Sequence, residues 1–203
     1  MLDYITADAE DAGYTTDEYG QYEVADQDIH QSAGDGDEGI ARNAMGLRHS
    51  LGILVETRVD SDLRNGPDEI NEPAVHMRRV VSHTVAIDAV LRFMRDRGPQ
   101  IAEITQTARA NAIKEGKQRN EPVFFGGADN AEPTEDQIVD PPPCGYELSG
   151  GDVTKLSDVL ALLDIDHSGT FVEMSQVSEP LIPLLLDERG TRHAVAGEPV
   201  DDC

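Results

Sequence analysis

The sequence predicts an α/β fold with a small α+β unit appended at its carboxyl-terminal end. A nearly continuous apolar run, Leu51 to Val55, is bounded by turn-forming residues. Apolar residues repeat at spacings of three and four between Pro73 and Arg97, and a helix–strand–helix pattern follows residue 143. The first pattern is typical of a buried strand and the second of an amphipathic helix.

The first 38 residues are acidic, contain many glycines and tyrosines, and lack sustained periodicity. Only Leu2 to Ala12 has the features of a helix, which we interpret as the end of one. The abrupt start leads us to expect that further sequence precedes Met1.

The run Leu51–Val55 is expected to be a strand buried on both faces, since short apolar runs between turn signals are typical of such strands. Glu56 follows it directly. In open α/β sheets the ligand crevice lies at the carboxyl ends of the strands, so Glu56 is placed where chemistry occurs. The plain alternative is a solvated strand end.

The clearest helix is expected from Pro73 to Arg97. Gly98-Pro99 should end it, and a second, more polar helix is expected over Gln100–Lys117. We interpret the apolar stripe of the first helix as ordinary core packing. The stripe consists of Met77, Val80, Thr84, Ile87, Leu91 and Met94.

Three domains are expected along the chain. Residues 1–118 form the main domain, with a turn-rich connection at 59–72. Residues 119–143 read as an acidic linker rich in proline and glycine. Residues 144–203 form the appendage, with its expected elements at Val153–Leu163 (helix), Thr170–Met174 (strand) and Ser178–Leu186 (short helix with Ser178 as N-cap).

Composition excludes some classes of partner. The formal net charge is −24, from 40 acidic and 16 basic residues, and such a surface repels phosphate backbones, so we expect no nucleic-acid partner. No apolar stretch reaches the length of a membrane span, so no membrane partner is expected. No signal peptide is visible, and the compartment stays open, an extracellular one included. A bridge between Cys144 and Cys203 is also left open.

One segment resembles a known family. Arg42-Asn43-x-x-Gly46-Leu47-Arg48, running into Gly52-Ile-Leu-Val-Glu56-Thr57, resembles the last catalytic segment of zinc carboxypeptidases of the carboxypeptidase A type. The resemblance is strongest over residues 34–60. It implies a peptide substrate, a zinc cofactor and Glu56 as the catalytic general base. It also implies that the chain is the carboxyl-terminal part of a carboxypeptidase-like mixed sheet flanked by helices.

The zinc ligands that the resemblance implies are not in this chain. The family supplies a His-x-x-Glu pair and a later histidine, and none of the six histidines here has a glutamate three residues after it. The chain is therefore expected to be inactive alone, with the missing amino-terminal part of the catalytic domain as its partner. His30 is a weak match to the later ligand, and the plain alternative is a loop histidine.

Three residues before the run are candidates for substrate binding. Arginine binds a carboxylate through two parallel hydrogen bonds, so Arg48, and after it Arg42 and Asn43, are assigned to the substrate. The alternative for Arg48 is a structural salt bridge. The family's substrate-capping tyrosine has no match, because no tyrosine lies between Tyr22 and Glu56.

A second class of function rests on Asp164-Ile-Asp166-His-Ser168-Gly169-Thr170. This segment matches the first half of an EF-hand calcium loop, in which oxygen ligands occupy positions 1, 3, 5 and 7 and glycine occupies position 6. Position 12 is Ser175 rather than glutamate, so the favoured interpretation is an aspartate-rich turn. The alternative function is a non-enzymatic acidic module that binds calcium or a protein partner.

Overall fold

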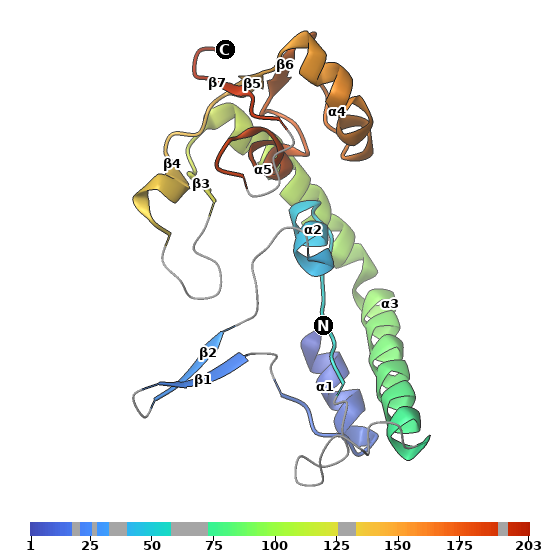
Figure 1. The fold of residues 1–203 in the computed structure, drawn as a ribbon. Coiled ribbons are helices and arrows are strands. Elements are labelled where there is room, and N and C mark those ends of the chain that lie inside the picture. The colour runs from blue at the N-terminus through green and yellow to red at the C-terminus, as the bar shows by residue number, and fades with distance from the viewer. Residues whose placement is uncertain (18–20, 26–27, 33–39, 58–72, 126–132, 191–194) are drawn as a thin grey trace. The chain divides into compact units, whose positions relative to one another are not determined.

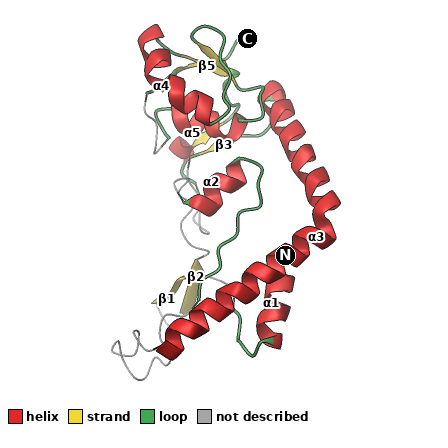
Figure 2. Cartoon of the chain, turned by 90° about the vertical axis from the view of Figure 1, so that its right-hand side faces the viewer, coloured by secondary structure: helices red, strands yellow, loops and turns green. Residues whose placement is uncertain are grey.

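The computed structural model describes residues 1–17, 21–25, 28–32, 40–57, 73–125, 133–190 and 195–203; for 21–25 and 28–32 it describes the backbone. The chain is mixed α/β, with long and short helices and small antiparallel sheets (Figures 1 and 2). Among these residues no helix is both long and apolar enough to cross a membrane.

The chain divides into two compact units. The first contains residues 1–20 and 53–103, and the second contains residues 21–52 and 104–203. Each unit is assembled from two separate stretches of the chain. The expected domains at 1–118, 119–143 and 144–203 stay a prediction.

The first unit is built on helices α1 (Leu2–Asp11) and α3 (Pro73–Gln118), the latter continuing into the second unit. Helix α1 confirms the expected amino-terminal helix. Its Ile5 packs with Ala86 and Ala89 of α3, whose small side chains let the two helices approach closely. An ion pair between Asp8 and Arg92, and an edge-to-face contact between Tyr4 and Phe93, support this packing.

The expected break at Gly98-Pro99 is wrong, because α3 runs without interruption through Pro99. Proline removes one backbone hydrogen bond and costs about 3 kcal/mol inside a helix. The sequence beyond it, from Gln100 to Gln118, is rich in alanine, glutamate and other helix-forming residues. The propensity of these residues offsets the local loss, and the helix continues.

The second unit contains the remaining elements. They are β1 (Gln21–Ala25), β2 (Asp28–Ser32), α2 (Ala41–Leu47), β3 (Val123–Phe124), η2 (Glu135–Gln137), β4 (Ile138–Val139), β5 (Gly145–Glu147), α4 (Gly150–Leu162), β6 (Phe171–Glu173), η3 (Glu179–Leu181), α5 (Ile182–Leu186) and β7 (Glu198–Val200). β1 and β2 form an antiparallel pair, and so do β3 and β4, which lie within the expected linker. A three-stranded antiparallel sheet has the order β6-β5-β7.

The appendage follows the sequence-based prediction closely. Helix α4 confirms the expected helix, β6 confirms the expected strand, and η3 with α5 accounts for the expected short helix. Ser178 is the N-cap residue of η3, as predicted, but its side chain makes no capping hydrogen bond: its hydroxyl donates to the carbonyl oxygens of Leu163 and Asp164, at 2.9 and 2.8 Å. These two carbonyls lie just past the end of α4, where helical hydrogen bonds run out.

A buried polar network lies in the core of this unit. Asp187, which is 2% exposed, accepts hydrogen bonds from the Tyr146 hydroxyl and from the Arg189 guanidinium and backbone N–H. Burial alone would raise the pKa of the Asp187 carboxyl, but the hydrogen bonds from Arg189 and Tyr146 outweigh it and hold that pKa below its usual value.

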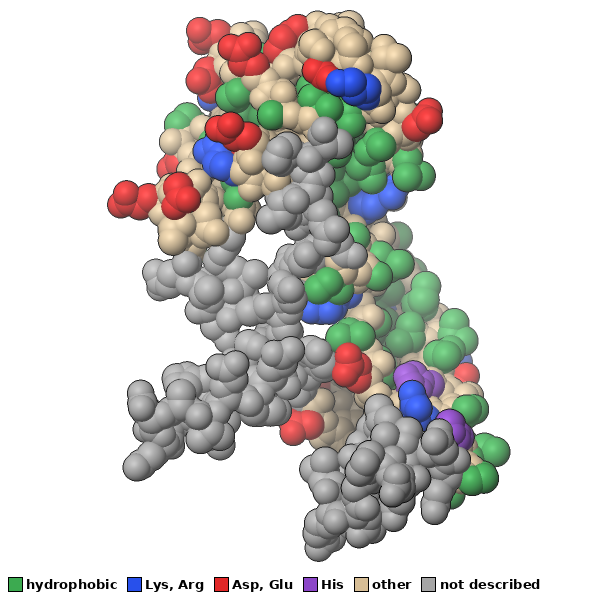
Figure 3. Space-filling view, viewed as in Figure 1, with side chains coloured by type: hydrophobic (Ala, Val, Ile, Leu, Met, Phe, Trp, Pro, Cys, Tyr) green, Lys and Arg blue, Asp and Glu red, His purple; other side chains and the backbone are tan. Residues whose placement is uncertain are grey.

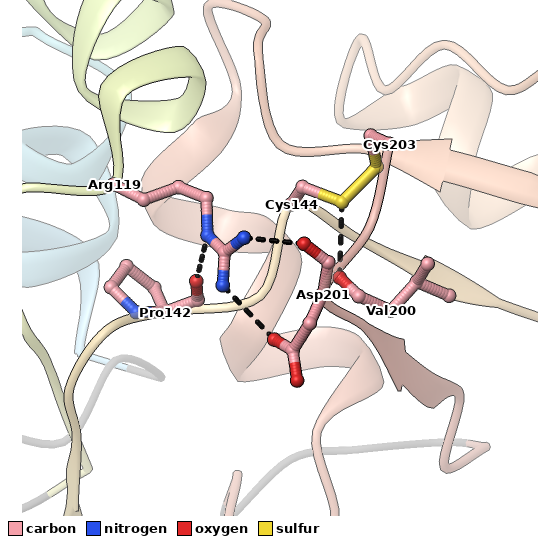
Figure 4. The surroundings of a disulfide bond; sticks show 6 residues. All are labelled: Arg119, Pro142, Cys144, Val200, Asp201 and Cys203. Carbon is pink, nitrogen blue, oxygen red and sulfur yellow. Dashed lines mark hydrogen bonds and ion pairs between the residues drawn. A yellow bond between two sulfur atoms is a disulfide. The ribbon is translucent and has the colours of Figure 1, made fainter.

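The carboxyl-terminal tail is tied to the unit by covalent and polar contacts (Figure 4). The bridge left open from the sequence is formed, joining Cys144 and Cys203 across 59 residues. Closing a loop of this length stabilises the folded state by about 4 kcal/mol in the chain-entropy account. Arg119, at the end of α3, donates to the carbonyl oxygens of Pro142 and Asp201 and forms an ion pair with the Asp201 carboxylate.

Candidate functional site

Glu56 lies in the first unit, near the end of the segment Leu51–Thr57, and its side chain is exposed. The buried strand predicted here is wrong: these residues belong to no strand, and Leu51 is 50% exposed. From residue 53 the side chains alternate, with Ile53 and Val55 packing against the core of α1 and α3. Only one side of the segment therefore packs against the core.

The backbone of this segment has no hydrogen-bonded neighbour among the residues that the structure describes. Within the described part of the chain, residues 51–57 form no backbone–backbone hydrogen bond. The end of the segment is instead held by a side chain, since Thr57 Oγ1 lies 3.3 Å from Nδ1 of His83 on α3. The same nitrogen lies 2.9 Å from the Arg79 carbonyl oxygen, so the two contacts compete for it.

The apolar stripe of α3 is exposed, which corrects its interpretation as ordinary core packing. We call Met77, Val80, Thr84, Ile87, Leu91 and Met94 the α3 seam. Met77, Val80, Ile87, Leu91 and Met94 are 53–63% exposed. The helix buries Val75, Ala86 and Ala89 on another side instead, because α1 covers the small residues and nothing described covers the large ones. Figure 3 shows apolar side chains gathered along this helix.

A shallow, open hollow lies at the amino-terminal end of the seam. Its lining is His76, Arg79, Val80, His83, Thr84 and Ile87. The Nε of Arg79 is buried and has no hydrogen-bond partner within the described residues. Sequence reasoning overlooked this group, although His76, Arg79 and His83 recur at spacings of three and four on one helix face.

The three candidate substrate-binding residues lie together in the second unit. Arg42 and Asn43 are on α2, half-buried and engaged in interactions, while Arg48 follows the helix and is exposed. The chain then folds back, and Gly52 approaches the Arg42 carbonyl so closely that a Cβ there would lie 2.2 Å from the oxygen. His49 contacts the Val177 carbonyl oxygen at 2.8 Å.

Glu56 belongs to a different unit from these three residues. The first unit therefore positions Glu56, and the second unit positions the three candidate substrate-binding residues.

The side chains described do not fit a zinc ion. Across the described ranges, no three histidine, cysteine, aspartate or glutamate side chains gather as a metal site. His49, His83 and His167 each contact a backbone carbonyl oxygen. His30 lies in β2, where only the backbone is described, and His193 lies outside the described residues. We therefore assign no zinc ligand to the described side chains.

The calcium-like loop is organised by side chains of the chain itself. Gln176 accepts a hydrogen bond from the Asp166 N–H and donates to the carbonyl oxygens of Asp166 and Glu173. Asp164 adopts a φ of 57°, which aspartate tolerates better than most residues. The amide of Gln176 therefore ties the loop together from within.

No family model, curated protein or solved structure matches this chain.

Proposed function

We propose that this chain is the carboxyl-terminal part of a carboxypeptidase-like zinc peptidase and supplies its general base, Glu56. One observation carries the proposal. The segment that contains Glu56 belongs to no strand and has no hydrogen-bonded backbone neighbour among the described residues, while the helix that follows it exposes a row of large apolar side chains.

A single partner could satisfy both the backbone of residues 51–57 and the exposed α3 seam. An extended backbone without neighbours leaves N–H and C=O groups that a paired strand would satisfy. Burying a leucine, isoleucine, valine or methionine side chain contributes about 1.5–3 kcal/mol, and five such residues of the α3 seam are more than half exposed. A sheet that paired with residues 51–57 and covered the seam would remove both costs. We propose that this sheet is the missing amino-terminal part of the catalytic domain.

The chemistry assigned to this chain concerns its own residues. The exposed carboxylate of Glu56 takes a proton from the attacking water and passes it to the leaving amine, the usual work of a general base. Arg48, with Arg42 and Asn43, binds the terminal carboxylate of a peptide substrate by charge-assisted hydrogen bonds. Zinc, when bound, polarises the scissile carbonyl; its ligands are assigned to the missing part.

The alternative is a non-enzymatic acidic module, and the same exposed seam favours its protein-binding form. The two proposals differ in what covers the seam: a sheet of the same catalytic domain or an unrelated protein. The calcium-binding form is less favoured, because Gln176 already joins the loop that a calcium ion would organise.

The deciding experiment is to read the gene upstream of Met1. The first proposal requires an in-frame His-x-x-Glu motif followed by a further histidine, and a stop codon before any such motif contradicts it. The 203-residue chain by itself should neither retain zinc through dialysis nor hydrolyse peptides. Stoichiometric zinc together with peptidase turnover in this chain would overturn the assignment of the ligands to a missing part.

A further inference from the structure

The hollow at the amino-terminal end of the α3 seam brings basic side chains together with an apolar wall. His76, Arg79 and His83 line it, spaced three and four residues apart, so successive turns of the helix place them in one row. The rest of its lining is Val80, Thr84 and Ile87. All these residues belong to the first unit, and Figure 3 shows histidine side chains beside basic and apolar ones on this part of α3.

The guanidinium of Arg79 lacks an acceptor. Its Nε is buried and has no hydrogen-bond partner within the described residues. Two arginines further along α3 are paired, Arg92 with Asp8 and Arg95 with Asp96, and neither pair includes Arg79. A buried donor of a charged group is costly without an acceptor, so Arg79 calls for a negatively charged oxygen.

The imidazole of His83 is already oriented on the helix. Its Nδ1 lies 2.9 Å from the Arg79 carbonyl oxygen, which can only accept, so this nitrogen carries the hydrogen. The other ring nitrogen, Nε2, makes no hydrogen bond with a described residue, and it becomes a donor when the ring takes up a proton. His76 also makes no hydrogen bond with a described residue. Both rings are exposed, and protonated imidazoles add positive charge beside Arg79.

The local charge favours an anion here, although the whole chain is acidic. Residues 73–97 contain five arginines and two aspartates, whereas the chain has 40 acidic and 16 basic residues. Glu56 and Asp88 lie near the lining in sequence; both are exposed, and neither forms an ion pair with the described lining. Exposed charges further away than about 8 Å are largely screened at physiological ionic strength, so the basic side chains of the hollow decide its preference.

We propose that this hollow binds a phosphate group, either as inorganic phosphate or as a phosphate monoester. The planar fork of Arg79 holds two phosphate oxygens through parallel hydrogen bonds, and the imidazolium groups of His76 and His83 donate to the phosphate from either side. A doubly charged phosphate matches one guanidinium and two ionisable rings better than a singly charged carboxylate does. Val80 and Ile87 form the wall on which the organic group of a monoester packs. The site does not depend on the proposed peptidase function.

The direct test is an NMR titration of the imidazole resonances in the wild-type 203-residue chain, at a constant pH of about 6.5, within the range in which histidine ionises. Inorganic phosphate should shift the resonances of His76 and His83. Those of His49 and His167, which contact backbone carbonyl oxygens in the second unit, should stay in place. Sodium chloride at equal ionic strength controls for screening. Shifts of His76 and His83 no larger than in sodium chloride, or equal shifts of all four rings, would overturn the proposal.

Phenyl phosphate and acetate identify the source of the bound group. Tighter binding of phenyl phosphate than of inorganic phosphate assigns the hollow to monoesters, and equal or weaker binding assigns it to free phosphate. Acetate should bind more weakly than inorganic phosphate, because it carries one charge. Acetate binding as tightly as inorganic phosphate contradicts a phosphate site.

Variants of Arg79 test which group holds the phosphate. Arg79→Gln should weaken phosphate binding by about ten- to a hundredfold, the range for losing hydrogen bonds to a charged group. Arg79→Lys keeps the charge without the planar fork, so it should also bind phosphate more weakly than the wild type. The matched control is Arg97→Gln, which makes the same change of charge at an exposed arginine about 27 Å further along α3.

Arg97→Gln should keep the wild-type affinity for phosphate. Wild-type affinity in Arg79→Gln, or an equal loss in Arg97→Gln, contradicts the site, since the second result would mean that phosphate senses only the overall charge. The unchanged resonances of His49 and His167 report that each variant is folded. The titration of the wild-type chain decides the proposal even if a variant of Arg79 does not fold.

Discussion

Tyr146 donates a 3.0 Å hydrogen bond to Asp187, 41 residues further along the chain, and both side chains are buried almost completely. The bond joins the central strand β5 to the residue that ends α5. Arg189 forms an ion pair with the same carboxylate, so the buried negative charge of Asp187 has a positive partner. This network therefore links the sheet to the last helix of the appendage.

Removing either partner should have unequal effects. Tyr146→Phe loses one hydrogen bond and should cost about 1–2 kcal/mol of unfolding free energy. Asp187→Ala leaves a phenol and a guanidinium without their acceptor and should cost about 3–5 kcal/mol. Urea unfolding at pH 7 measures both. Equal losses of unfolding free energy in the two variants would contradict the assignment of Asp187 as the acceptor shared by Tyr146 and Arg189.

The pH dependence of this network follows from the carboxyl group of Asp187. The folded pKa of Asp187 lies below its ordinary value of 3.8, so its stabilisation is present above that pH. It should be lost as pH falls through the folded pKa. The destabilisation caused by Asp187→Asn should accordingly shrink in acid, and a difference from wild type that stays constant down to pH 2 would contradict this assignment.

The α3 seam should tolerate polar residues in the 203-residue chain. Ile87→Ser and Leu91→Ser remove exposed apolar groups, so each should change the unfolding free energy by less than about 0.5 kcal/mol. Ala89→Leu, on the buried face of the same helix, should cost about 1–3 kcal/mol through overpacking. A loss above 2 kcal/mol in Ile87→Ser would mean that the seam is already covered in this chain.

The calcium-like loop should give no calcium-specific stabilisation. A ligand that binds the folded state raises the melting temperature through the term RT ln(1 + [L]/Kd). Gln176 already ties the loop, so millimolar calcium should shift the melting temperature no more than magnesium does by screening the acidic surface. A larger calcium shift that Asp164→Ala abolishes would favour the calcium-binding alternative.

The sequence correctly predicted those elements whose formation depends on signals within their own segment. Helix α4, strand β6 and the short helix at residues 178–186 carry their own periodicity, proline and turn signals, and they fold where expected. The Cys144–Cys203 bridge could not be decided from the sequence, because two cysteines carry no information about their distance. The close approach of Gly116 on α3 to the Met174 carbonyl oxygen is a tertiary contact and left no local signal in the sequence.

The residues of the candidate site were harder to predict because their roles depend on partners. An apolar run such as Leu51–Val55 forms a strand only if another strand pairs with it, and none of the described residues does. The periodicity of the α3 seam correctly indicated a helix face made to be covered. It could not indicate what covers that face: no described residue does, and the interpretation as ordinary core packing was wrong.

The final prediction concerns Glu56 in the longer protein that the proposal requires, purified with its zinc-binding part. General-base catalysis contributes about 10²–10⁴-fold to the rate, so Glu56→Gln should lower kcat by at least a hundredfold. The substitution changes charge with little change in size, and the side chain is exposed. Zinc content and melting temperature should therefore stay at the parent values.

The matched control is Glu103→Gln, an exposed glutamate of α3 in the same unit, which should keep full activity. Peptide hydrolysis by Glu56→Gln within a few-fold of the parent would remove the general-base assignment, whatever the zinc content. In the 203-residue chain, Glu56→Gln should leave the unfolding free energy unchanged within about 0.5 kcal/mol, because an exposed side chain has little to lose. A large loss there would mean that Glu56 is structural, and it would explain any loss of activity without catalysis.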